Sequence, residues 1–150
     1  MKTISYRGQL DMGLQDQIRL KTNKGKVGYK ITKFQVLSTL PGQGSGHEYI
    51  AQIYNKDQTG SIGGTVNFTD SELLAVVFQE FRNTAAGTGA GMNTTIIFDN
   101  AEFNQDIFIS ITDATGGTTP CNYYIELETM ELSDIQSTQL TLKNLRTITN

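Results

Sequence analysis

Residues 106–112, DIFISIT, decide the fold, because they carry the clearest periodic signal in the chain. Ile107, Ile109 and Ile111 recur at every second position, which places all three on one face of a β-strand. Segment 121–131, CNYYIELETME, repeats the pattern. One side of this segment is apolar and consists of Tyr123, Ile125 and Leu127. The other side consists of Tyr124, Glu126 and Glu128. This predicts strands with one face in a core and one face toward solvent or a partner.

The rest of the chain also favours strands. It contains 20 Thr, 15 Gly, 11 Gln and 10 Asn, with only 18% charged residues, a composition that suits strands joined by turns better than solvated helices. In segment 27–40 the apolar phase changes between Ile31 and Phe34, which indicates a bulge. Asn23 to Lys26 predict a tight hairpin after residues 16–22. Further strands are expected at 3–10, 16–22, 27–40, 48–55 and 94–99.

Three segments need separate treatment. Segment 70–81 fits either a helix capped by Asp70 or a buried strand, and we favour the strand. Segment 133–149 can begin with one helical turn at Ser133, but its threonines favour a final strand. Segment 84–93 is rich in small residues and is expected to be a mobile surface loop.

These elements predict an all-β fold in a single domain, residues 1–150. Many short strands without strand–helix–strand alternation leave a double-sheet sandwich or a closed barrel. We favour a jelly-roll-like antiparallel β-sandwich of eight or nine strands. In strand 48–55 aromatic residues point to both faces, so we expect both faces to be covered, by a second sheet or by a neighbouring subunit.

The composition also narrows the chemistry. The single cysteine, Cys121, excludes an intrachain disulfide and a thiolate zinc site of the usual kind. There is no run of about 18 apolar residues, and the first residues lack the apolar middle of a secretory signal. We therefore expect no membrane partner, synthesis in a cytoplasm, and no cofactor.

Charge is distributed unevenly along the chain. Residues 1–33 hold eight cations and two anions, a net charge of +6, whereas the remaining residues carry −9. The preferred interpretation of the basic segment is a solvated hairpin rich in lysine. The alternative is contact with an acidic neighbour or between copies, and aromatic residues are enriched at such interfaces. With a pI of about 5.1 and four Arg, nucleic acid is not an expected partner. The interface candidates are Arg19, Lys21, Lys24, Lys26, Lys30, Lys33, Tyr49, Tyr54 and Tyr124.

Reactive or ligand-binding motifs are weak. His47 lies beside Glu48 without a motif around it, and Cys121 is expected to be a small buried residue. The glycines at 87–91 lack the lysine and helix start of a phosphate loop. Segment 99–106 concentrates oxygen ligands, so Asp99, Glu102 and Asp106 are weak calcium candidates, although turn capping is the preferred interpretation.

Two blocks carry a family resemblance. Residues 5–36, SYRGQLDMGLQDQIRLKTNKGKVGYKITKFQV, and 121–148, CNYYIELETMELSDIQSTQLTLKNLRTI, resemble small virion structural proteins of marine tailed bacteriophages. The resemblance implies a β-sandwich subunit present in many copies on the particle, as capsid decoration or in a head or tail accessory position. It implies no active-site residues.

Three functions from different classes follow. The first is a non-enzymatic virion structural protein that decorates the capsid, bound to the major capsid protein and forming homo-oligomers; a head–tail accessory subunit is a variant of it. The second is a glycan-binding module of a head or tail fibre, since jelly rolls include lectins. The third, hydrolase activity, has only His47 and scattered carboxylates in its favour.

Overall fold

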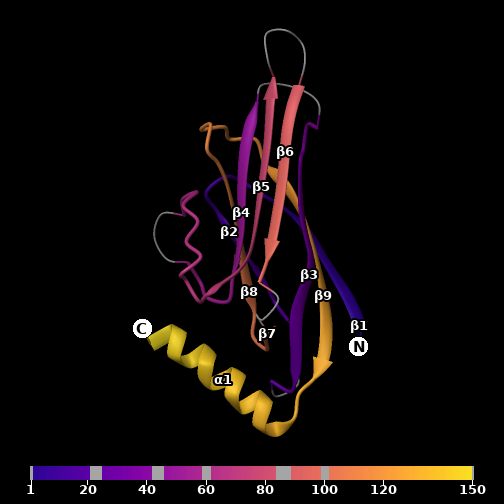
Figure 1. Cartoon of the computed structure of the whole chain (residues 1–150), viewed down its shortest axis with the longest axis vertical. Helices are drawn as coiled ribbons and strands as arrows, with labels where there is room; N and C mark the ends of the chain where they lie inside the picture. Colours follow the sequence, from indigo (N-terminus) through magenta and orange to yellow (C-terminus); the bar gives the residue numbers. More distant parts are fainter. Residues whose placement is uncertain are drawn as a thin grey trace.

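The computed structural model describes residues 2–20, 25–41, 46–58, 62–83, 89–98 and 102–149. Within these ranges nine strands form two antiparallel sheets that pack face to face (Figure 1). Sheet A has the order β1 (Lys2–Leu10), β9 (Cys121–Glu131), β3 (Val27–Ser38) and β7 (Glu102–Phe103). Sheet B has the order β2 (Gln15–Ile18), β8 (Ile107–Asp113), β4 (His47–Tyr54), β5 (Leu73–Asn83) and β6 (Gly89–Ile97). The predicted all-β sandwich is confirmed.

The strand pairing is that of a jelly roll. β1 pairs with β9, β2 with β8, β3 with β7 and β4 with β5, so the partners are nested like the two arms of one long hairpin. Rolling up this hairpin brings β9 beside β3 and β8 beside β4, which completes the two sheets. β6 is added to sheet B outside β5.

The core lies between the inner faces of the two sheets. Ile107, Ile109 and Ile111 of β8 are 0% exposed, and Ile125 and Leu127 of β9 face them from sheet A with the same exposure. These residues therefore point inward, as the period-two pattern of the sequence predicts. Tyr123 links the sheets, because its hydroxyl donates to Asp16 Oδ2 of β2 at 2.7 Å.

The bulge predicted in β3 is confirmed. The register of β3 against β9 shifts between Ile31 and Lys33, so Thr32 has no partner residue in that ladder. Tyr29 and Ile31 before the bulge and Phe34 after it are all buried. The extra residue keeps both halves of the strand turned toward the core.

The preferred strand in segment 70–81 is also confirmed as β5. Asp70 does not cap a helix there. Its Oδ1 accepts a hydrogen bond from the Glu72 backbone N–H at 2.9 Å, which closes the turn that precedes β5.

Two turn predictions were wrong. The expected hairpin at Asn23–Lys26 does not form between its flanking strands, because β2 lies in sheet B and β3 lies in sheet A. Gly25 keeps a positive φ of 69°, so its turn chemistry serves a crossover between sheets. The expected loop 84–93 ends early, since β6 starts at Gly89 and residues 89–93 pair with residues 79–83 of β5, which satisfies their backbone groups. Residues 84–88 lie outside the described residues.

The predicted final strand 133–149 was wrong over nearly its whole length, because α1 (Asp134–Thr149) is a helix. Ser133 Oγ accepts from the Gln136 N–H at 3.2 Å, and Gln136 Oε1 accepts from the Ser133 N–H at 3.1 Å. This reciprocal capping box begins the helix. Thr138 and Thr141 donate their hydroxyls to the carbonyls four residues earlier, which satisfies β-favouring side chains within a helix.

The outer face of sheet B is partly covered by the connection between β4 and β5. Gln52, on that face, donates Nε2 to the Thr65 carbonyl at 3.2 Å. Gly64 lies so close to Ile50 that an added methyl group would be 2.8 Å from its Cδ1. The second face of β4 is thus covered in part by its own chain. Among the residues that the structure describes, no helix is long and apolar enough to cross a membrane.

Candidate functional site

The outer face of sheet A brings together three of the predicted interface residues, Lys30, Lys33 and Tyr124. It is formed by three adjacent strands in the order β1, β9 and β3. The side chains of the β1 and β3 rows are mostly exposed, and those of the central β9 row are half-buried. We call this surface the A face; its residues are Thr3, Ser5, Arg7, Gln9, Asn122, Tyr124, Glu126, Glu128, Lys30, Lys33, Gln35 and Leu37.

The register of the strands sets acidic residues against basic ones. Glu126 of β9 is opposite Lys33 of β3, and the lysine Nζ lies 3.9 Å from the carboxylate Oε1. Glu128 is opposite Lys30, which also faces Glu102 of β7. The basic segment is therefore matched by carboxylates of its own chain, and the A face is a mixed surface. This arrangement favours recognition by geometry and hydrogen bonding over simple attraction to an acidic partner.

Tyr124 lies at the centre of the A face. It is flanked by Arg7 on β1 and Gln35 on β3. Its hydroxyl donates to Glu126 Oε1 at 2.7 Å, and this hydrogen bond raises the pKa of Tyr124 above its usual value. The ring is thus held in one orientation by a charged neighbour, as suits an aromatic anchor at an interface.

Sequence reasoning found Tyr124 and the lysines but missed Arg7 and Gln35. The alternation in β9 already placed two glutamates on the side of Tyr124. What it lacked was the strand order, which sets β1 and β3 on either side of β9.

The other predicted interface residues lie elsewhere. Lys26 is ion-paired with Asp134 at 3.2 Å, at the start of α1. Tyr49 is 1% exposed and packs in the core, so it offers no surface to a partner, contrary to the prediction. Tyr54 is on the outer face of sheet B, where its hydroxyl donates to Gln52 Oε1 at 2.7 Å. Arg19 is exposed just after β2, whereas Lys21 and Lys24 lie outside the described residues.

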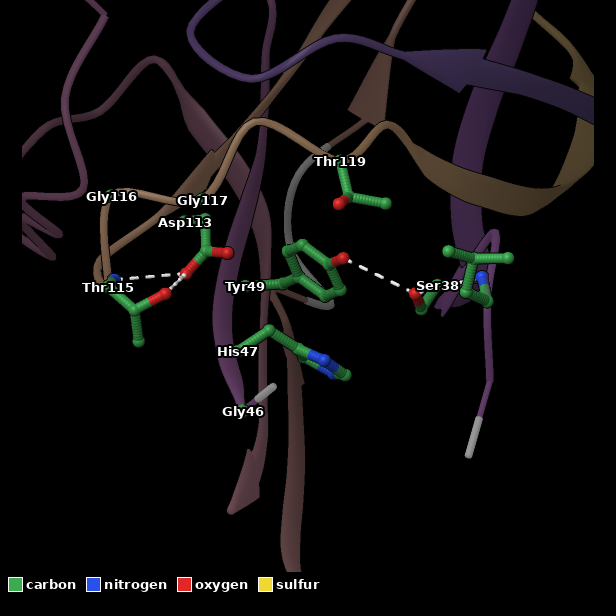
Figure 2. Close-up of a pocket in the computed structure, with 10 residues that line it drawn as sticks. Ser38, Gly46, His47, Tyr49, Asp113, Thr115, Gly116, Gly117 and Thr119 are labelled. Carbon is green, nitrogen blue, oxygen red and sulfur yellow. Dashed lines mark hydrogen bonds between the residues drawn. The ribbon is translucent and has the colours of Figure 1, made fainter. Parts of the chain in front are cut away.

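A hollow of about 400 Å³ opens at the end of the sandwich near His47 (Figure 2). The imidazole stacks on the Tyr49 ring at a centroid distance of 4.2 Å, and burial lowers the pKa of His47 although Asp113 opposes this. Asp113 Oδ1 accepts from the Glu48 N–H and from the Thr115 N–H and hydroxyl, at 2.7 to 3.1 Å. The Asp113 carboxylate thus holds the β8–β9 turn in place. Its role in the hollow is to cap this turn.

Cys121 is held inside the sandwich. It is 0% exposed, and burial raises the pKa of the thiol to about 12. A thiol with this pKa is protonated at neutral pH, whereas nucleophilic cysteines need the thiolate. The expectation of a small buried residue at this position is confirmed.

The two described calcium candidates, Asp106 and Glu102, have different structural roles. Asp106 accepts from the Leu20 N–H at 2.8 Å and from Gln17 Nε2 at 2.9 Å, which ties β8 to the end of β2. Glu102 is the exposed cross-strand neighbour of Lys30. Asp99 lies outside the described residues. Within the described ranges, no three His, Cys, Asp or Glu side chains come together as a metal site.

Neither a protein-family model nor a curated protein matches this sequence.

Proposed function

We propose that this protein is a non-catalytic structural subunit of a phage virion, and that it decorates the capsid by docking its A face on the major capsid protein. The observation that carries the proposal is the A face itself, a three-stranded surface on which lysines oppose glutamates around a tyrosine that is hydrogen-bonded to Glu126. A virion location follows from the resemblance, and synthesis in the host cytoplasm agrees with a fold that has one buried thiol.

The family resemblance and the A face involve the same strands. Block 5–36 contains most of β1 and most of β3, and block 121–148 begins with β9. These three strands make the A face. If the two blocks mark what such proteins share, the shared part includes both the inner core and this outer surface.

The size of the A face suits a contact that is repeated. Three strands about 4.8 Å apart and about eight residues long cover roughly 400 Å², about half of what each partner buries in a standard interface. One such contact is weak. On a particle with many copies, the contacts act together, and a weak interface then suffices for stable attachment.

Co-sedimentation with empty capsids that lack this chain tests the proposal. We expect saturable binding at low and moderate salt, and we expect Tyr124→Ala to weaken it about tenfold or more, because the central aromatic anchor is lost. Phe68→Ala is the matched control, since Phe68 is 54% exposed and packs edge-on against Phe98, away from the A face. Failure of the wild-type chain to sediment with capsids, or equal binding by both variants, would overturn the proposal.

A glycan-binding module is the second candidate, and one observation favours it. A hollow of about 290 Å³ on the outer face of sheet B is lined by neutral groups, among them Gln52, Tyr54, Gln58 and Ser110. Amides, hydroxyls and one aromatic ring suit an uncharged sugar. A glycan array with the purified chain tests this candidate, and a Ser110→Ala variant that binds the same sugar equally well would contradict a site at this hollow.

A further inference from the structure

β1 is a long strand at the outer edge of sheet A (Figure 1). It pairs with β9 over all nine of its residues, and the register contains no bulge. Within the described part of the chain, β9 is its only strand partner. On the other side of β1 the backbone N–H and C=O groups of alternate residues therefore have no strand to bind, and such an edge is a template for a further strand.

The other strands at the ends of the two sheets offer less to a partner. β7 and β2 have only two and four residues, and short edge strands present few backbone groups. β6 is as long as β1, but it lies against β3, where the Thr95 hydroxyl donates to the Phe34 carbonyl at 3.4 Å. Among the described strands, β1 is therefore the edge best suited to strand addition.

The inner side of β1 is covered only in part. Ile4 and Tyr6 pack against the core but remain half-buried, so a strand added beside them would bury more apolar surface. At Gly8 the Tyr123 ring takes the place of a side chain, because a Cβ at Gly8 would lie 2.5 Å from the tyrosine hydroxyl oxygen. The inner side of β1 thus has two large residues followed by a position without a side chain.

A second copy of β1 fits this pattern. When two β1 strands pair antiparallel about a two-fold axis at Tyr6, all nine residues of each strand are paired. Ile4 of each copy is then opposite Gly8 of the other, so a large side chain meets the position that has none. The two Tyr6 rings are opposite each other, and aromatic cross-strand pairs stabilise a sheet.

The outer side of the strand favours the same register. With the axis at Tyr6, each Arg7 is opposite Ser5 of the other copy, and no two like charges are directly opposite. Moving the axis to Arg7 would set the two arginines opposite each other, which destabilises a sheet, and would pair only residues 4–10. Moving it to Ser5 would pair only residues 2–8. The Tyr6 register is therefore the one that β1 prefers for itself.

We propose that the protein forms a two-fold dimer in which two β1 strands pair antiparallel and join the two copies of sheet A into one continuous sheet. An axis perpendicular to the sheet puts both A faces on the same side. Together they cover roughly 800 Å², the area that each partner buries in a standard interface. This use of the dimer on a particle rests on the proposed function. The edge contact itself is small, so its expected dissociation constant is on the order of 100 µM.

Sedimentation equilibrium of the isolated chain, without capsids, tests the association. We expect the mass of the wild-type protein to rise toward that of a dimer with concentration. Ser5 is exposed, so it can be replaced by either charge. Ser5→Lys should weaken the dimer about tenfold and Ser5→Glu should strengthen it about tenfold, because each dimer contains two contacts between residue 5 and Arg7. Thr94→Lys and Thr94→Glu, at an exposed position of β6, are the matched controls and should leave the constant unchanged.

Disulfide cross-linking tests the register and does not depend on the Ser5 variants. Thr3 is opposite Gln9 of the other copy in the proposed dimer, at a Cα separation of about 4.5–5.5 Å that a disulfide spans. A mixture of Thr3→Cys and Gln9→Cys should therefore cross-link under mild oxidation. A mixture of Ser5→Cys and Gln9→Cys is the control, because its cysteines are two positions out of register, about 7–8 Å apart. Cys121 is 0% exposed and takes no part.

Three results would overturn the inference. The first is a wild-type chain that stays monomeric at 1 mM, on the order of ten times the expected constant. The second is a shift in the same direction for Ser5→Lys and Ser5→Glu, with thermal unfolding used to show that both variants are folded. The third is cross-linking of the control mixture as fast as that of Thr3→Cys with Gln9→Cys. Since capsids are absent from these experiments, such results leave the A-face proposal to its own co-sedimentation test.

Discussion

Asn104 is the residue on which the position of α1 depends most. Its side chain is 1% exposed, and Nδ2 lies 3.1 Å from the Gly25 carbonyl, 3.4 Å from the Ser137 carbonyl and 3.1 Å from Thr141 Oγ1. One amide group thus joins the segment before β3, the β7–β8 connection and the helix. The two amide hydrogens can fully satisfy two of these acceptors at a time.

We predict that Asn104→Ala destabilises the protein by about 2–3 kcal/mol. Two buried hydrogen bonds contribute about 1 kcal/mol each, and the cavity and the unsatisfied carbonyls add to the loss. For a chain of this length this corresponds to a fall in Tm of roughly 5–10 °C. Urea unfolding followed by circular dichroism measures the change. In a separate hydrogen-exchange measurement, the backbone amides of α1 should exchange faster than in the wild-type protein.

Thr138→Ala is the matched control for this prediction. Thr138 is exposed on the same helix and bonds only within it, to the Asp134 carbonyl at 2.8 Å. We expect a change within about 0.5 kcal/mol, as for most surface substitutions. A change of that size for Asn104→Ala would refute the role given to Asn104, because α1 would then not depend on the buried amide.

Three further predictions concern stability. Ser133→Ala removes the helix cap and should cost about 1 kcal/mol in urea unfolding, with reduced helical signal. The Cys121 thiol has a pKa of about 12 when folded and about 8.5 when unfolded, so the unfolded chain loses its proton first as the pH rises. Stability should therefore fall above about pH 8.5 by up to about 1.4 kcal/mol per pH unit, and Cys121→Ala should flatten this slope between roughly pH 9 and 10. Gly8→Ala places a methyl group 2.5 Å from the Tyr123 hydroxyl and should cost about 1–3 kcal/mol, whereas Gly63→Ala meets nothing within 4 Å and should be nearly neutral in the same assay.

The sequence predicted the parts of the fold that depend on local alternation. Ile107, Ile109 and Ile111 are buried as expected, and the phase change after Ile31 is a bulge. Both signals are set by which side of a strand faces the core, and a run of seven residues is enough to show this.

The errors came from features that local patterns do not contain. Of the hairpin signal at Asn23–Lys26, Gly25 has the positive φ that a turn uses, but only the global pairing shows that β2 and β3 belong to different sheets. For segment 133–149, the prediction gave more weight to the threonine content than to the short capping signal. Ser133 and Gln136 nevertheless have the spacing of a capping box. The capping pair was therefore the better guide to this segment.

Only part of the candidate site was predicted, because local patterns do not contain the strand order. Tyr124 and Lys33 were named from residue type and charge, without knowledge that they are near neighbours. Strand order and register bring Arg7 and Glu126 to them, and these depend on contacts more than 90 residues apart in the chain.

The central claim is that the A face meets the capsid. The most direct measurement is an electron cryo-microscopy reconstruction of empty capsids incubated with the purified chain. We predict density for the sandwich on the capsid surface with β1, β9 and β3 against the major capsid protein and sheet B turned outward. Density that seats sheet B on the capsid, or bare capsids at saturating protein, would contradict the account.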